Sequence, residues 1–320
     1  MTDPQANLET LDGHPVLRFQ RRLSHPPAKV WRAVTEPAEL AHWFPALVET
    51  EPRIGARMRF TFPDSAPNEL AESLTSGEVL EYDEPRVFAF RWHQDVLRFE
   101  IVPAATGCVL HFSQTMGGDW VGRLAAGRNA VGWDECLGYL TARLAGEEFQ
   151  PPTDRLTPLE RYIAAFGLDE GTVSPTPGGF EIFFARDLVW RSAEQVWQLL
   201  TEKVEPRVGA EPPPRTTNGY VPAGQLTEVE LPDHLEYSWL HEGEPAGRVR
   251  WRFVPDPELG NRLELRQTIP AHLAGLRATA LAAWHVQLEL FFAALYGEIR
   301  CPWPEERTTE LHQRYQRRLG

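Results

Sequence analysis

Apolar and polar residues alternate along several short segments of the chain, which is the pattern of strands with one buried face. In the first half these segments span residues 17–23, 57–62, 77–82, 87–92, 97–102 and 109–116. Turn-forming stretches at 83–85 and 104–107 separate neighbouring segments, as expected for hairpins. The pattern predicts an antiparallel meander with one apolar face, preceded by a loose lead-in over residues 1–15.

Helical spacing of apolar residues predicts three helices in the same half. Short helices are expected over 27–35 and 38–44, and a long helix over 125–144 that ends at Gly146. The apolar stripe of the long helix is Trp133, Leu137, Leu140 and Leu144. Only this helix is long enough to cover the apolar face of the sheet. The predicted fold class is therefore α+β, an antiparallel sheet wrapped on a long C-terminal helix, which is the helix-grip arrangement.

The second half of the chain repeats the first in the same order. Residues 76–92 align without a gap on residues 223–239, and residues 98–103 align on residues 250–255. Trp133 recurs as Trp284, each at the same distance from a Gly-Glu pair. A repeat of roughly 150 residues has the size of a domain. The expected elements of the second half are strands near 224–230, 234–240, 248–254 and 262–268 and a helix over 276–296.

This repeat predicts two tandem domains, a complete one over residues 1–150 and a shortened one over residues 180–300. Residues 151–179 are expected to form a helix near 158–166 and a Pro/Gly linker at 174–179, and residues 301–320 a charged C-terminal helix. The second domain lacks a counterpart of the second short helix and of the strand at 57–62. A Pro-rich loop over 206–222 replaces them, and we expect it to close the interior of that domain.

Charge and cysteine usage narrow the classes of partner. The formal net charge of -13 argues against nucleic-acid binding and against docking on anionic membranes. The three cysteines are widely spaced without a CxxC motif, which fits a reduced protein without disulfides. Because the chain begins without a signal-peptide pattern and no apolar run suggests membrane insertion, a cytoplasmic location is expected.

A set of residues in the first domain carries a resemblance to a known family. They are Pro27-Ala28-Lys29-Val30-Trp31, Thr35-Glu36-Pro37, Leu40, Trp43, Gly77-Glu78-Val79, Glu84-Pro85, Trp92, Gly132-Trp133, Leu137, Leu140 and Gly146-Glu147. With them the domain resembles the START-like (SRPBCC, Bet v-like) superfamily, and within it the heat-shock protein 90 ATPase activator homologue family. The second domain resembles it more loosely. The resemblance implies a hydrophobic cavity between sheet and helix, in a superfamily that includes lipid carriers, hormone binders, polyketide cyclases and co-chaperone domains.

Strand parity places large apolar side chains on the face that meets the long helix. The candidate cavity residues are Trp43, Phe60, Phe88, Phe90, Trp92, Phe99, Phe112, Gln114, Trp133 and Leu137. Few polar groups share this face; they are Gln114, Gln267 and the Tyr237 hydroxyl. Such a lining suits an apolar or aromatic ligand held by one or two hydrogen bonds, although the same side chains could simply fill a core.

Three functions remain open at this point. The first is non-catalytic binding of a small hydrophobic or aromatic molecule in the first domain. The others are a co-chaperone-like interaction with a chaperone ATPase and a cyclase- or aromatase-type enzyme. No catalytic residue, cofactor or metal is expected, because the sequence has no zinc-ligand spacing and no GxSxG, Walker or GxGxxG motif. His111, Asp134 and Glu135 are expected mostly on polar faces.

Overall fold

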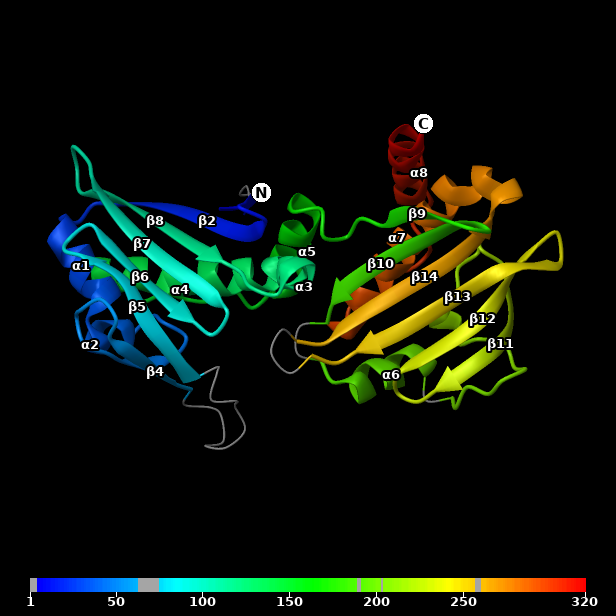
Figure 1. The fold of residues 1–320 in the computed structure, drawn as a ribbon, viewed down its shortest axis with the longest axis horizontal. Helices are drawn as coiled ribbons and strands as arrows, with labels where there is room; N and C mark the ends of the chain where they lie inside the picture. Colours follow the sequence, from blue (N-terminus) through cyan, green and yellow to red (C-terminus); the bar gives the residue numbers. More distant parts are fainter. Residues whose placement is uncertain (1–4, 63–74, 189–190, 203, 257–259) are drawn as a thin grey trace. The chain divides into compact units, whose positions relative to one another are not determined.

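The computed structural model describes residues 5–62, 75–188, 191–202, 204–256 and 260–320. The chain forms two compact units, Met1–Phe166 (unit one) and Gly167–Gly320 (unit two). Each unit is an antiparallel sheet with a long helix against one face (Figure 1). The predicted α+β class with two tandem helix-grip domains is confirmed.

The sheet of unit one runs in the order β1-β2-β8-β7-β6-β5-β4-β3. Its strands are β1 (Ala6–Leu11), β2 (His14–Leu23), β3 (Leu47–Glu49), β4 (Arg57–Thr61), β5 (Ser76–Asp83), β6 (Val87–Trp92), β7 (Asp95–Pro103) and β8 (Cys108–Thr115). Its helices are α1 (Pro27–Thr35), α2 (Pro37–Leu40), α3 (Asp119–Leu124), α4 (Ala126–Ala145) and α5 (Leu156–Ala165). Alternate residues of β7 are buried, namely Leu97, Phe99 and Ile101, so the predicted strand parity holds.

The sheet of unit two runs in the order β11-β12-β13-β14-β10-β9. Its strands are β9 (Thr172–Thr176), β10 (Gly179–Asp187), β11 (Ala223–Glu230), β12 (His234–His241), β13 (Glu244–Val254) and β14 (Arg262–Pro270). Its α-helices are α6 (Ala193–Thr201), α7 (Arg277–Leu295) and α8 (Glu305–Leu319). Ser192 and Gln195 form a capping box that starts α6, which fixes where the chain turns into this helix.

Strand register makes the central strands that the two units share equivalent residue by residue. Leu17 of β2 pairs with Gln114 of β8, and Ile182 of β10 pairs with Gln267 of β14. The same glutamine bonds to the long helix in both units, because the indole nitrogen of Trp133 donates to Gln114 Oε1 at 2.7 Å and that of Trp284 donates to Gln267 Oε1 at 2.6 Å. The repeat therefore preserves a buried polar link between sheet and helix.

The two long helices differ in how much of their surface is covered. Helix α4 buries one stripe, whereas α7 lies between its sheet and α8 and buries residues on all sides. Residues 271–295 are long and apolar enough to cross a membrane by composition, but 78% of the window that passes is buried inside the protein. An apolar helix covered in this way is the expected centre of a core.

Each unit extends further at both ends than the sequence pattern indicated. The expected lead-in contains β1, which pairs with β2, and the expected linker at 174–179 contains the end of β9, which pairs with β10. Helices α5 and α8 pack on α4 and α7 respectively. Residues 151–179 therefore do not form a separate linker. The boundary between the two units falls between residues 166 and 167. Strands β1 and β9 escaped notice because they are edge strands whose side chains are mostly exposed.

Unit two has, within its described residues, no counterpart of β3 and β4. The loop before β11 instead runs under the sheet, where the Thr216 carbonyl accepts hydrogen bonds from the Tyr237 hydroxyl at 2.6 Å and from the Trp251 indole at 3.1 Å. All three residues are fully shielded from solvent. The Pro-rich loop therefore fills space between sheet and helix in unit two.

Candidate functional site

The predicted cavity residues of unit one lie together between the sheet and α4. They come from β4 (Phe60), β6 (Phe88, Phe90, Trp92), β7 (Phe99), β8 (Phe112, Gln114), α4 (Trp133, Leu137) and the turn after α2 (Trp43). All of them are buried except Trp92, which is partly exposed. Their rings contact one another, with centroids 4.6 Å apart for Phe112 and Trp133 and 4.8 Å apart for Phe99 and Phe112. Among the described residues, the interior is thus a continuous aromatic cluster that reaches the surface at Trp92.

Phe44 is the hub of this aromatic cluster, although the sequence analysis did not select it. Its ring lies 5.5–6.2 Å from those of Phe60, Phe90, Trp92 and Trp133. The expected helix over 38–44 ends earlier, at Leu40, and the chain then turns so that Phe44 points into the interior. Helical spacing beyond residue 40 therefore gave no sign of this contact.

Trp43 has a different part in the same turn. Its indole nitrogen donates to the Ala33 carbonyl at 2.8 Å, which ties the turn to α1. One ring edge meets Phe99, at a centroid distance of 5.9 Å. Trp43 therefore holds the turn that presents Phe44.

A carboxylic acid, Asp95, closes the interior at the same end as Trp92. The amide nitrogen of Gln114 donates to Asp95 Oδ2 at 2.5 Å, and the Gly117 backbone donates to Oδ1 at 2.9 Å. The other end of Gln114 accepts from Trp133, so acid, amide and indole form one hydrogen-bonded chain. Burial raises the pKa of Asp95 above its ordinary value, against the lowering effect of these donors.

The sequence analysis missed Asp95 because this residue starts β7 directly after a hairpin turn. A polar residue at such a place is usually interpreted as part of the turn. Counting back along β7 from Phe99 and Leu97 would have found it, because residues two apart share a face. The sequence therefore contained the signal, but the turn obscured it.

Unit two has glycine where unit one has this acid. Leu97 pairs with Gln114 and Val249 pairs with Gln267, so Asp95 corresponds to Gly247. A Cβ at Gly247 would lie 2.5 Å from the indole nitrogen of Trp239, which donates to the Thr268 carbonyl. Because Gln267 and Trp284 still bond without an acid, the partly buried carboxyl of unit one is not required for the link between sheet and helix.

A surface groove of about 840 Å³ reaches the two residues between Trp92 and Asp95, which are His93 and Gln94. It also runs over Gly77, where a Cβ would lie 2.8 Å from the Phe60 ring, so only glycine fits the strand this close to the aromatic cluster. His93 has a φ of 57°, which turns the chain sharply at the hairpin. The groove lies beside this end of unit one, although neither Trp92 nor Asp95 is among its lining residues.

The other predicted polar residues lie outside this interior. His111 is exposed, Glu135 pairs with Arg155, and Asp134 pairs with Arg21 at 2.6 Å. These placements agree with the expectation of polar faces. Among the described residues, no interaction joins any of these three side chains to the aromatic cluster.

Two groups of residues in the described parts of the chain have ligand atoms within 4.8 Å of one another and could hold a metal ion. They are Asp169, His285 and Glu289, and Glu230, Asp233 and His234. Both groups lie in unit two. The second is a hairpin cluster in which His234 already meets Glu228 at 3.1 Å.

Comparison with known proteins identifies the family of unit one. Residues 24–145 match the model of the family described as activator of Hsp90 ATPase homolog 1-like protein. Unit one belongs to this family. The match spans α1 to the last residue of α4, which includes most of the elements around the aromatic cluster, and it leaves out β1, β2 and α5.

Solved structures similar to this chain include several small bacterial proteins. A conserved Enterococcus faecalis protein of unknown function is 18% identical, with a TM-score of 0.43, over 51% of this chain and 91% of its own. CalU16 from Micromonospora echinospora is 19% identical, with a TM-score of 0.38, over 51% and 94%. The Mesorhizobium loti protein MLL2253 is 26% identical, with a TM-score of 0.33, over 41% and 96%. No curated protein matches this chain.

Proposed function

We propose that unit one binds a small molecule with an aromatic or apolar body and at least one hydrogen-bond donor. The body would lie against Trp92 and Phe44, and the donor would meet the carboxyl of Asp95. The observation that carries this proposal is the largely shielded acid beside Trp92, where the described part of the aromatic cluster is partly exposed. A carboxylate has more acceptor capacity than the two donors it receives from Gln114 and Gly117.

The comparison between the repeats supports a binding role for Asp95 over a purely structural one. Unit two keeps the bond between glutamine and tryptophan but replaces the acid with Gly247 and fills its interior with the 206–222 loop. A buried carboxyl costs free energy unless it gains partners, so its presence in one unit alone favours a use there.

Binding of N-phenyl-1-naphthylamine tests the proposal, because this neutral fluorescent probe has an aromatic body and one N–H donor. We expect one probe per chain, and about tenfold weaker binding for Asp95→Asn, since a hydrogen bond to a charged group contributes about 1.5–3 kcal/mol. Glu100→Gln is the matched control, because Glu100 lies on β7 with its carboxylate on Arg98 at 2.5 Å, away from Asp95 in parity. Equal binding by wild type and Asp95→Asn would refute the assigned role of Asp95.

A second candidate function is contact with a chaperone ATPase, which the description of the matching family favours. Pull-down with a purified chaperone of the heat-shock protein 90 class, followed by its ATPase rate with and without the full chain, tests this candidate. A raised ATPase rate supports it, and neither capture nor rate change would rule it out.

A further inference from the structure

The residue after the tryptophan that both long helices share is a second position where the units differ. In unit one it is Asp134, which pairs with Arg21 at 2.6 Å and accepts a hydrogen bond from the Tyr162 hydroxyl. The Gln5 backbone donates to the same hydroxyl at 3.2 Å. These contacts tie β2, the residue before β1 and α5 to α4.

Unit two has equivalents of the residues around Asp134, but a different residue stands in the place of Asp134 itself. Arg186, Tyr315 and the Gly171 backbone take the places of Arg21, Tyr162 and Gln5, and Gly171 donates to the Tyr315 hydroxyl at 3.0 Å. The residue equivalent to Asp134 is His285, which is completely buried. An imidazole therefore replaces the carboxylate at the middle of a packed polar cluster.

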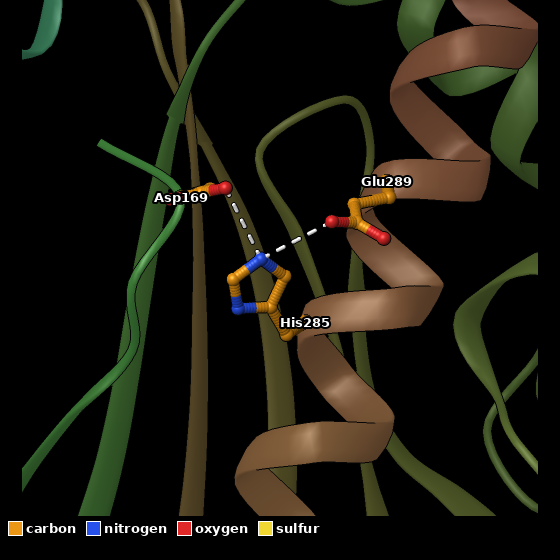
Figure 2. A group of neighbouring side chains, drawn as sticks. All are labelled: Asp169, His285 and Glu289. Carbon is orange, nitrogen blue, oxygen red and sulfur yellow. Dashed lines mark ion pairs between the residues drawn. The ribbon is translucent and has the colours of Figure 1, made fainter. Parts of the chain in front are cut away.

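Two carboxylates have been added around this imidazole. Nε2 of His285 lies 3.2 Å from Asp169 Oδ2 and 3.3 Å from Glu289 Oε1, so one ring nitrogen faces both acids (Figure 2). Glu289 lies one helical turn further along α7. Its counterpart in unit one is Gly138, where a Cβ would lie 2.6 Å from the Phe149 ring, so that unit has no room for such a ligand.

His285 and Asp169 do not satisfy each other's hydrogen-bonding capacity. His285 Nε2 and Asp169 Oδ1 are both shielded from solvent and lack a hydrogen-bond partner of acceptable geometry. Asp169 is only 5% exposed, so bulk solvent does not reach it freely. Unpartnered atoms of this kind are expensive in a protein interior, which points to a partner that binds there.

The spacing of the three ligand atoms fits a tetrahedral metal ion. With metal–nitrogen and metal–oxygen bonds of about 2.0–2.2 Å, neighbouring ligand atoms of a tetrahedron lie about 3.3–3.5 Å apart. The two distances at Nε2 are close to this range. Nδ1 of His285 lies 2.8 Å from the Tyr315 hydroxyl, which would hold the ring in place as the outer partners of metal-bound histidines do.

A metal ion could reach this cluster from the surface at Glu289. The side chain of Glu289 is 27% exposed and lines a surface groove of about 430 Å³ together with Arg307. Arg307 binds Glu289 from α8 at 2.8 Å. Arg186 bonds the main-chain carbonyls of Leu168 and Asp169, which leaves the Asp169 carboxylate for another cation.

We propose that Asp169, His285 and Glu289 bind a divalent transition-metal ion, with Zn²⁺ as the best fit to one imidazole and two carboxylates. Three protein ligands leave the fourth tetrahedral position for water. The sequence analysis expected no metal, because these ligands are far apart along the chain and match no spacing motif.

Titration of the tag-free, chelator-treated full chain with Co²⁺ and Zn²⁺ tests the site. We expect one ion per chain, a visible absorption band typical of four-coordinate Co²⁺, and displacement of Co²⁺ by Zn²⁺. Asp169→Asn and Glu289→Gln keep the side-chain shapes and are expected to weaken binding about 10-fold or more. His272→Ala, which removes an exposed histidine of unit two outside both groups, is the control and should bind as the wild type does.

The proposal is overturned if the folded wild type binds neither ion, or if Asp169→Asn and Glu289→Gln bind with unchanged affinity. Far-UV circular dichroism of each variant shows that the comparison is made on folded protein. Absence of binding would assign the cluster a structural role between α7 and α8.

Discussion

Truncation of equivalent tryptophans in the two units gives the sharpest test of which interior is open. Trp92 of β6 and Trp239 of β12 occupy the same place in the repeat. Trp239 is 2% exposed and its indole nitrogen bonds the Thr268 carbonyl, whereas Trp92 is partly exposed and stacks on Phe60 at 4.8 Å. The same change should therefore cost different amounts.

Trp239→Ala removes a fully packed ring and a buried hydrogen bond. Truncation of a buried tryptophan costs about 3–5 kcal/mol, and the lost hydrogen bond adds about 1 kcal/mol, so we expect about 4–6 kcal/mol. Trp92→Ala loses its ring stacking, about 0.5–1.5 kcal/mol, and only part of the packing free energy, so we expect about 1–3 kcal/mol.

Urea unfolding of the full chain, read by hydrogen exchange of peptides from β6 and β12, assigns each loss to its own unit. Equal losses for the two variants, or a larger loss for Trp92→Ala, would refute the view that unit one is open at this end. A Trp92→Phe variant is the control for retained stacking and should lose less than Trp92→Ala.

Three further predictions concern single groups. Gln114→Leu and Gln267→Leu should each lower the unfolding free energy by about 1–3 kcal/mol, because each leaves a buried indole N–H unpaired, and an urea-derived loss below about 0.5 kcal/mol would contradict this. Burial raises the folded-state pKa of Asp95 above its unfolded value, so the protonated form stabilises the fold at acid pH and this contribution is lost as pH rises. The unfolding free energy of the wild type relative to Asp95→Asn should therefore fall from about pH 4 upward. An increase with pH would contradict this prediction. Cys301 is exposed, whereas burial raises the pKa of Cys136 to about 12, so mass spectrometry after brief iodoacetamide treatment at pH 8 should find Cys301 modified first.

Much of the fold could be predicted because binary patterning and the repeat constrain it jointly. The predicted strands around Phe60, Phe90 and Phe99 exist with the expected parity, and the helix with Trp133 covers them. Edge strands β1 and β9 were not predicted, because their mostly exposed side chains give no sustained alternation of apolar and polar residues.

The candidate site was predictable in its apolar part and in Gln114. Ring positions such as Phe112 follow from period-two alternation, but Phe44 depends on a turn after α2 and Asp95 was hidden beside a hairpin. The His285 cluster could not be predicted, because burial of that histidine depends on α8 packing against α7. Contacts between distant segments decide such sites, and spacing along the chain does not reveal them.

Native mass spectrometry of the freshly purified full chain, followed by denaturing extraction, tests the central claim most directly. We predict one small organic molecule per chain in the wild type and in Glu100→Gln, and its loss or strong depletion in Asp95→Asn. A molecule retained equally by Asp95→Asn would contradict the site. So would a wild type that carries no molecule and takes up no N-phenyl-1-naphthylamine.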